Sequence, residues 1–153
     1  MSNWIKERAD EVRRIEKQRK EDFDRKVVAA SDLRTLLRPL WKELVETVEQ
    51  SIRQFNSEFP EANRQIDPFE KGADNFAIRR VAYPSVLVKV QLNQAGTAVQ
   101  YSISQVLRKG ANTVEKQAGF SYTAGDGQPG YADPNLRSHE DVAKLLLEPF
   151  FEF

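Results

Sequence analysis

The stretch SVLVKVQLNQAGTAVQYSIS, residues 85–104, decides the fold. Apolar residues recur at every second position in its first part, at Val86, Val88, Val90 and Leu92. Polar and apolar residues alternate again over 99–104. A period of two residues is that of a half-buried β-strand. Between the two runs, Gln94-Ala95-Gly96 predicts a tight hairpin turn. The stretch therefore predicts two antiparallel strands with one apolar face.

The same alternation continues on both sides of this hairpin. Residues 76–81 predict a strand before it. After it, a turn at Lys109-Gly110-Ala111-Asn112 leads into Val114, Ala118, Phe120 and Tyr122. We expect an antiparallel meander of about four strands, or five if Tyr131 extends it. Because one face of such a sheet is apolar, helices must cover it, and the fold class is α+β.

A strongly apolar helix is predicted before the sheet, from Ser31 to Phe59, with apolar residues recurring at spacings of three and four. Ser31 or Asp32 can serve as its N-cap. Pro39 lacks the N–H that would bond back to Thr35, so it predicts either a kink or the true start of the helix. Pro60 ends the helix, because the residue before a proline avoids the α conformation.

The first 30 residues predict a charged helical arm, separate from a single α+β domain over 31–153. Through Lys26 the arm carries nine bases and seven acids, and acids precede bases by four residues at several points, as in Asp10 with Arg14 and Asp22 with Lys26. Its apolar residues form one line on the helix, which we call the apolar line. The members of this line are Ile5, Ala9, Val12, Phe23, Val27 and Ala30. Glu16, Arg19 and Lys20 interrupt it in the middle, so it is too poor to dock the arm by itself.

A final helix is predicted from Ser138, where Ser-x-x-Asp has the form of a capping box ahead of an apolar run. Pro149 should end or bend this helix. Phe150, Phe151 and Phe153 then either close the core or form an exposed anchor for a partner, and core closure is the commoner use of such residues.

Composition excludes several classes of function. The chain has 23 basic and 23 acidic residues, so no net field steers it toward nucleic acid or anionic lipid. It has no cysteine, which removes thiol chemistry and cysteine metal sites and is typical of a reducing compartment. No apolar run reaches the length of a signal or membrane segment. We expect a cytoplasmic protein without a membrane or nucleic-acid partner.

No motif amounts to an active site. Residues 125–130 match G-x-G-x-x-G, but Pro129 stands where a dinucleotide site needs the start of a helix, so we interpret them as a turn. His139 is the only histidine, and we expect a solvent-facing residue at the helix start. The sequence predicts no catalytic residues, no metal site and no cofactor.

One face of the predicted sheet is rich in neutral polar side chains. Its members are Lys89, Gln91, Gln100, Ser102, Ser104, Glu115, Gln117 and Ser121. Solvated sheet faces commonly have this composition, although such a face can also bind a ligand or a peptide.

Two main hypotheses for function remain open, beside a weaker third class, a nucleic-acid accessory factor, which would require one basic surface made of Arg79, Arg80, Lys89, Arg108 and Lys109. The first is a non-enzymatic interaction or self-association module, in which the arm presents Trp4, Ile5, Val12 and Ile15 to a protein partner or to a second copy. The second is a small-ligand binding domain, or a small hydrolase or isomerase, with its pocket between the sheet and the central helix. Its lining candidates are Trp41, Arg80, Tyr83, Tyr101 and Tyr122.

Overall fold

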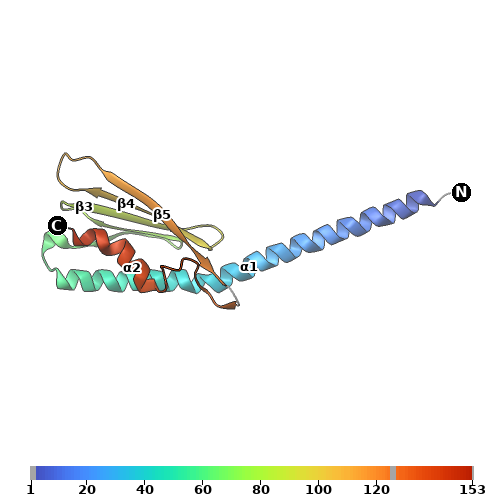
Figure 1. The fold of residues 1–153 in the computed structure, drawn as a ribbon, viewed down its shortest axis with the longest axis horizontal. Coiled ribbons are helices and arrows are strands. Elements are labelled where there is room, and N and C mark those ends of the chain that lie inside the picture. The colour runs from blue at the N-terminus through green and yellow to red at the C-terminus, as the bar shows by residue number, and fades with distance from the viewer. Residues whose placement is uncertain (1–2, 125–126, 153) are drawn as a thin grey trace.

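The computed structural model describes residues 3–124 and 127–152. One long helix, a six-stranded antiparallel sheet and a short C-terminal helix make an α+β fold, which confirms the predicted class (Figure 1). The elements run in the order α1 (Trp4–Glu58), η1 (Ala62–Arg64), β1 (Asp67–Lys71), β2 (Asn75–Arg80), β3 (Ser85–Leu92), β4 (Ala98–Val106), β5 (Val114–Thr123), β6 (Gly130–Tyr131), α2 (His139–Leu147) and η3 (Glu148–Phe151).

The predicted arm and the predicted central helix are one element. α1 continues through Ser31, Asp32 and Pro39, so the expected N-cap and the expected new start at Pro39 are wrong. The chain between 27 and 37 is rich in residues that tolerate a helix, and nothing in it forces a turn. The helix of 55 residues therefore continues through one internal proline, despite the unfavourable free energy of a proline at that position.

The sheet is a meander in which each strand pairs with its neighbours in sequence, in the order β1 to β6. The count is slightly higher than expected, because residues 67–71 add a strand at one edge and Tyr131 adds a two-residue strand at the other. β1 escaped prediction because Pro68 and its charged neighbours do not alternate in polarity. The central pairing of β3 with β4 follows the predicted hairpin, with Gly96 at a positive φ of 72° in its turn.

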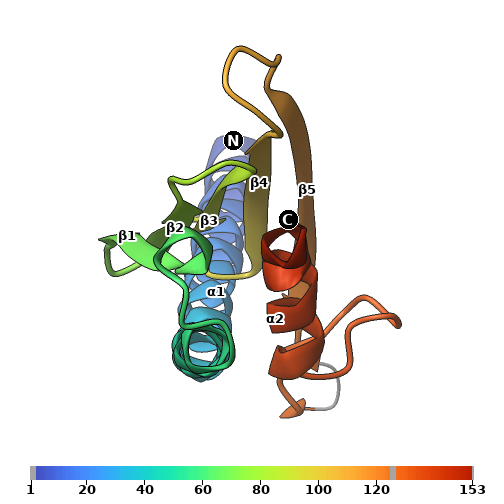
Figure 2. The same cartoon turned by 90° about the vertical axis from the view of Figure 1, so that its left-hand side faces the viewer.

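One face of the sheet is covered by α1 and α2, which lie side by side on it (Figure 2). α1 contributes a buried stripe from Leu37 to Phe55. The strands contribute the alternate residues predicted from the sequence, and Val88 and Val99 are fully buried. This apolar layer holds the two halves of the chain together, because burial of apolar area is the main favourable term in folding.

The chain turns from α1 into the sheet through two amide side chains. Asn56 exchanges two hydrogen bonds with the backbone of Ile66, at 2.8 and 3.0 Å. Gln65 donates to the carbonyls of Asn56 and Phe59 at the end of α1. The last turn of the helix is thereby capped, and the first strand is directed back over the helix.

α2 begins as the sequence predicts. Ser138 is its N-cap, and the Ser138 hydroxyl accepts a hydrogen bond from the Asp141 N–H at 3.3 Å. Asp141 in turn accepts from the Arg137 N–H rather than from Ser138 itself. Phe150 is completely buried, which confirms core closure for that residue, while Phe151 is half exposed and packs edge-on against Phe55. Phe153 lies outside the described residues.

Candidate functional site

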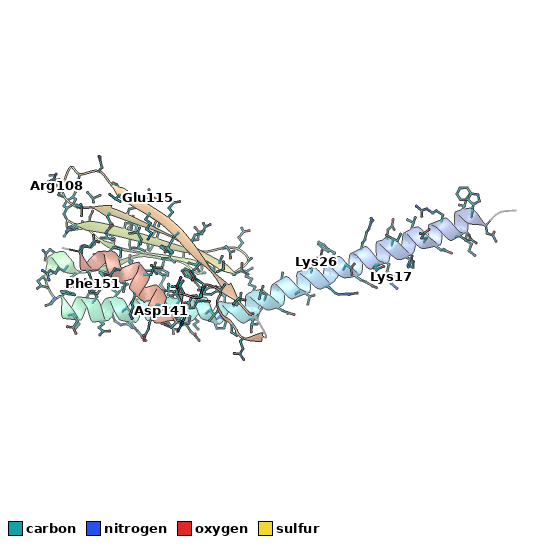
Figure 3. The ribbon with its side chains drawn as sticks, in the orientation of Figure 1. Lys17, Lys26, Arg108, Glu115, Asp141 and Phe151 are labelled. Atoms are coloured by element: carbon teal, nitrogen blue, oxygen red, sulfur yellow. The ribbon has the colours of Figure 1, made fainter. Side chains whose placement is uncertain are left out.

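The first 33 residues of α1, 4–36, extend beyond the sheet, and we call them the exposed arm (Figure 1). Every residue in this range is exposed except Ala9 and Ile15, which are intermediate. Lys17 and Lys26 lie on a stretch of ribbon that has no other element beside it (Figure 3). The first buried residue of α1 is Leu37. Apart from Arg34, whose side chain lies against the turn at Gly96, the exposed arm is thus stabilised mainly by its own helical hydrogen bonds rather than by packing on the body.

Salt bridges along the exposed arm run over three residues rather than the four expected. Arg13 approaches Asp10 at 3.6 Å and Arg25 approaches Asp22 at 4.0 Å, instead of Asp10 pairing with Arg14 and Asp22 with Lys26. Both spacings bring side chains to the same side of a helix, so local rotamers decide between them. All of these pairs are highly exposed and contribute little stability.

The four predicted partner-binding residues fall on two sides of the exposed arm. Ile5 and Val12 lie on the apolar line, with 65% and 38% of their surface exposed. Trp4, which is 63% exposed, and Ile15 lie about 80° further round the helix at 100° per residue. Phe23 and Val27 continue the apolar line toward the body and are at least half exposed. The apolar line therefore faces solvent on both sides of its charged middle.

The five predicted ligand-binding residues do not come together around one cavity. Trp41 is buried in the core, where its ring nitrogen donates to the Ala73 carbonyl at 3.0 Å. Tyr101 and Tyr122 are buried in the same layer. Tyr83 is 51% exposed in the turn between β2 and β3. Trp41, Tyr101 and Tyr122 belong to the core cluster that lies between the sheet and α1, where the pocket was expected.

Arg80 is buried to 2% exposure and binds the end of the chain rather than a pocket. Its guanidinium donates to the carbonyls of Pro84, Phe150 and Glu152 at 2.9, 2.6 and 2.7 Å. Burial lowers the pKa of Arg80, Arg64 lowers it further, and Glu152 opposes both. The neighbouring Arg79 points to the other face of the sheet and lies over the ring of Phe69. The arginines at this end therefore do not form one basic surface.

The polar sheet face is confirmed by the strand register, and it is hollowed. A groove of about 510 Å³ crosses β1 to β5 on the side away from the helices. Ala77, Lys89, Ser102 and Gln117 face each other across four strands in one row. Gly119 stands in the next row, where an added Cβ would meet the Val99 carbonyl at 2.8 Å. The small residues thus form the floor of the groove, and longer polar side chains form its walls.

A hydrogen-bonded chain of three side chains joins β6, α2 and α1. The Tyr131 hydroxyl lies 2.6 Å from His139 Nδ1, and His139 Nε2 lies 3.0 Å from a carboxylate oxygen of Glu43. The expectation of a solvent-facing His139 is wrong, because its side chain is only 20% exposed and is held on both ring nitrogens. Sequence reasoning missed Glu43 altogether, since it lies 96 positions from His139.

This chain of side chains fits a structural role better than a catalytic one. The sheet groove and a second groove of about 470 Å³ between α1 and α2 are both lined by other residues. A proton relay needs a substrate within hydrogen-bond reach. Here the three groups instead tie the start of α2 to α1 and to the edge of the sheet.

No group of three or more metal-ligating side chains occurs among residues 3–124 and 127–152. Over the same residues, no helix is apolar enough over sufficient length to cross a membrane. Comparison with family models, with curated proteins and with solved structures finds no match to this chain. The fold and the sites define an α+β protein with a long exposed helical arm.

Proposed function

We propose that this chain is a non-enzymatic interaction module, in which the exposed arm binds another protein chain. The observation that carries the proposal is the apolar line, which presents Ile5, Val12, Phe23 and Val27 to solvent along one side of a single helix. A helix that buries none of its apolar residues gains little from its own fold, because helical stability in proteins comes mostly from packing of the apolar face. A partner that covers this line supplies that packing.

The separation of the exposed arm from the body supports the same proposal. The buried stripe of α1 begins at Leu37 and packs on the sheet, so the body has a core without the arm. An amphipathic helix recognised by a partner presents anchors at spacings of three, four and seven, as Ile5, Ala9 and Val12 do. A cytoplasmic location, which the cysteine-free composition favours, remains part of this proposal.

The proposal is tested with the full chain and a variant carrying Ile5→Ser, Val12→Ser and Phe23→Ser. The expected result is a loss of the associated state, seen as a lower mass by light scattering or as a loss of captured partner from cell extract. The matched control replaces Val81, Leu107 and Val114 by serine, because these residues are about as exposed as Ile5 and Phe23 and more exposed than Val12, but lie on the body. A triple arm variant with the same mass and the same partners as the parent chain contradicts the proposal.

The sheet groove supports a second candidate, the binding of a small polar ligand. It is not the pocket expected between sheet and helix, because it lies on the opposite face. Glu70, Lys89 and the surrounding amide side chains offer donors and acceptors over a low floor. Screening of small polar fragments by NMR tests it. Shifts confined to the amides of Lys89, Ser102 and Gln117 support binding, and a screen that moves no groove amide rejects it.

A further inference from the structure

The side of the exposed arm that carries the apolar line and its charged middle has paired residues on either side of one central point. Three pairs of residues lie at equal distances on either side of the point between Lys17 and Gln18. The pairs are Ile5 with Ala30, Val12 with Phe23, and Glu16 with Arg19. Two pairs are apolar with apolar, and the third is acid with base. All six residues belong to one uninterrupted helix, so this symmetry in sequence is also symmetry in space.

We propose that the exposed arms of two copies of this chain pair in antiparallel orientation, with a two-fold axis through that midpoint. The inference rests on the proposed function and names its partner as a second copy. In this register each Val12 faces the Phe23 of the other copy, and each Glu16 faces its Arg19. A two-fold contact of this kind uses the same surface on both chains and closes on itself.

The spacing of the facing residues is that of a two-helix coiled coil. Residues that follow each other in alternating steps of four and three lie along one side of the helix, which we call the seam. The seam positions are 5, 9, 12, 16, 19, 23, 26 and 30. Lys26 is the one charged seam residue that does not face an opposite charge, because its counterpart is the small apolar side chain of Ala9. Its aliphatic stem can lie along the seam while the ammonium group remains in water.

Charge decides between antiparallel and parallel pairing. In a parallel pair, Glu16 faces Glu16 and Arg19 faces Arg19 at the middle of the seam, and like charges at facing positions repel. In the antiparallel pair both contacts become Glu16 with Arg19. The charged residues in the middle of the apolar line disfavour an apolar partner. In the antiparallel pair they are complementary to the same residues of the second copy.

The length of the exposed arm fits this register. Residue 4 of one copy faces residue 31 of the other, so the helices overlap over 28 residues, or about 42 Å. The overlap ends before Arg34, whose side chain lies against the turn at Gly96, and before the first buried residue, Leu37. The two bodies therefore sit at opposite ends of the paired arms without overlapping them.

Disulfide cross-linking tests the register, because the chain contains no cysteine. Val12→Cys and Phe23→Cys are made in separate full-length chains, and each is oxidised alone and after mixing and exchange. We expect a disulfide-linked dimer only in the mixture, since in this register two copies of position 12 lie about 16 Å apart, too far for a disulfide. Efficient cross-linking of each variant with itself overturns the antiparallel pairing, and so does the absence of a cross-link in every sample.

A charge reversal tests the central contact. Arg19→Glu places an acid opposite Glu16, and we expect the dimer dissociation constant to rise at least about tenfold, with recovery in the double variant E16R/R19E. Arg14→Glu changes the net charge equally but lies on the far side of the helix, and it should leave dissociation unchanged. Sedimentation equilibrium measures all four chains.

The outcomes separate this inference from the proposed function. A parent chain that is monomeric at every concentration, while its triple serine arm variant loses binding to a different protein, overturns self-pairing and leaves the interaction module intact. If the triple serine variant changes neither mass nor partners, both proposals fall.

Discussion

Arg80 is the one buried charged side chain among the residues that the structure describes, and its three hydrogen bonds explain why it is tolerated there. The planar guanidinium spreads its donors over a fan, so it reaches Pro84 in the next turn and both Phe150 and Glu152 near the end of the chain. A buried charge is costly unless it is hydrogen-bonded in this way. Arg80 thus attaches the C-terminal segment to the sheet.

Replacement of Arg80 by methionine should lower the free energy of unfolding by about 3 kcal/mol, because one buried and two partly buried carbonyl contacts lose their donor. Urea unfolding measures the change. Arg79→Met is the matched control at the adjacent position, where the side chain is exposed and only stacks on Phe69, and it should cost less than about 1 kcal/mol. Equal losses in the two variants would contradict the role given to Arg80.

Tyr122 and Tyr131 lie together at the edge of the core, with ring centroids 5.4 Å apart. Burial is the main cause that raises the pKa of both hydroxyls above the ordinary value near 10, and for Tyr122 the neighbouring Tyr131 raises it further. The Tyr122 hydroxyl is buried and has no partner of good hydrogen-bond geometry among the described residues. The folded state therefore favours the neutral form of both groups.

Stability should consequently fall at alkaline pH. Below about pH 10 both tyrosines are neutral in the folded and unfolded chains, so their contribution is fully present. Above it the unfolded chain releases protons that the folded chain retains, and the free energy of unfolding decreases with rising pH. Urea unfolding at several pH values tests this. Tyr122→Phe should flatten the decrease, while Tyr83→Phe serves as the exposed control; the same slope in parent and Tyr122→Phe would refute the assignment.

At the scale of elements, α1 has two roles in one helix. Residues 37–55 supply the stripe that packs on the sheet, and residues 4–36 supply the exposed arm. The helix does not break between them, and the arm projects away from the body as a continuation of the packed part (Figure 1). Pro39 lies just inside the packed part and is itself exposed, so the packing on either side keeps the helix intact around it.

Pro39→Ala should raise the free energy of unfolding by about 1 to 3 kcal/mol, because alanine restores the N–H that bonds to the Thr35 carbonyl and has a far higher helix propensity. Thermal and urea unfolding followed by circular dichroism measure the gain. Lys42→Ala, at an exposed position in the next turn, should change it by less than about 0.5 kcal/mol. A destabilised Pro39→Ala chain would mean that the proline favours a conformation that α1 needs.

At the scale of the whole molecule, one end is packed by the C-terminal segment and the other end is exposed to solvent. The C-terminal residues pack where α1 turns into the sheet. The ring centroids of Phe151 and Phe55 lie 5.0 Å apart, and Phe150 is fully buried. The opposite end of the molecule is the exposed arm (Figure 1). The C-terminal segment is thus part of the packed body, whereas the arm remains exposed to solvent.

Truncation after Glu148 should prevent folding of the body, since it removes Phe150 and the two carbonyls that Arg80 binds in the C-terminal segment. A milder test is Phe150→Ala, which should cost about 3 to 5 kcal/mol as expected for a fully buried phenylalanine. Phe151→Ala, at the half-exposed neighbour, should cost clearly less. A truncated chain that stays folded but loses a partner would instead favour the anchor interpretation of the C-terminal phenylalanines.

The class of the fold and most of its elements can be predicted from local sequence patterns. Alternation over 85–104 fixed the central hairpin, the spacing from Leu37 to Phe55 fixed the buried helix, and Ser138 fixed the start of α2, because these signals are local and repeat several times. Three features are visible only in the folded structure. They are the continuity of α1, the hydrogen bonds from Arg80 to the C-terminal segment, and the contact of His139 with Tyr131 and Glu43. These features depend on contacts between residues far apart in the chain or on the balance between one proline and a whole helix. Local periodicity does not contain that information.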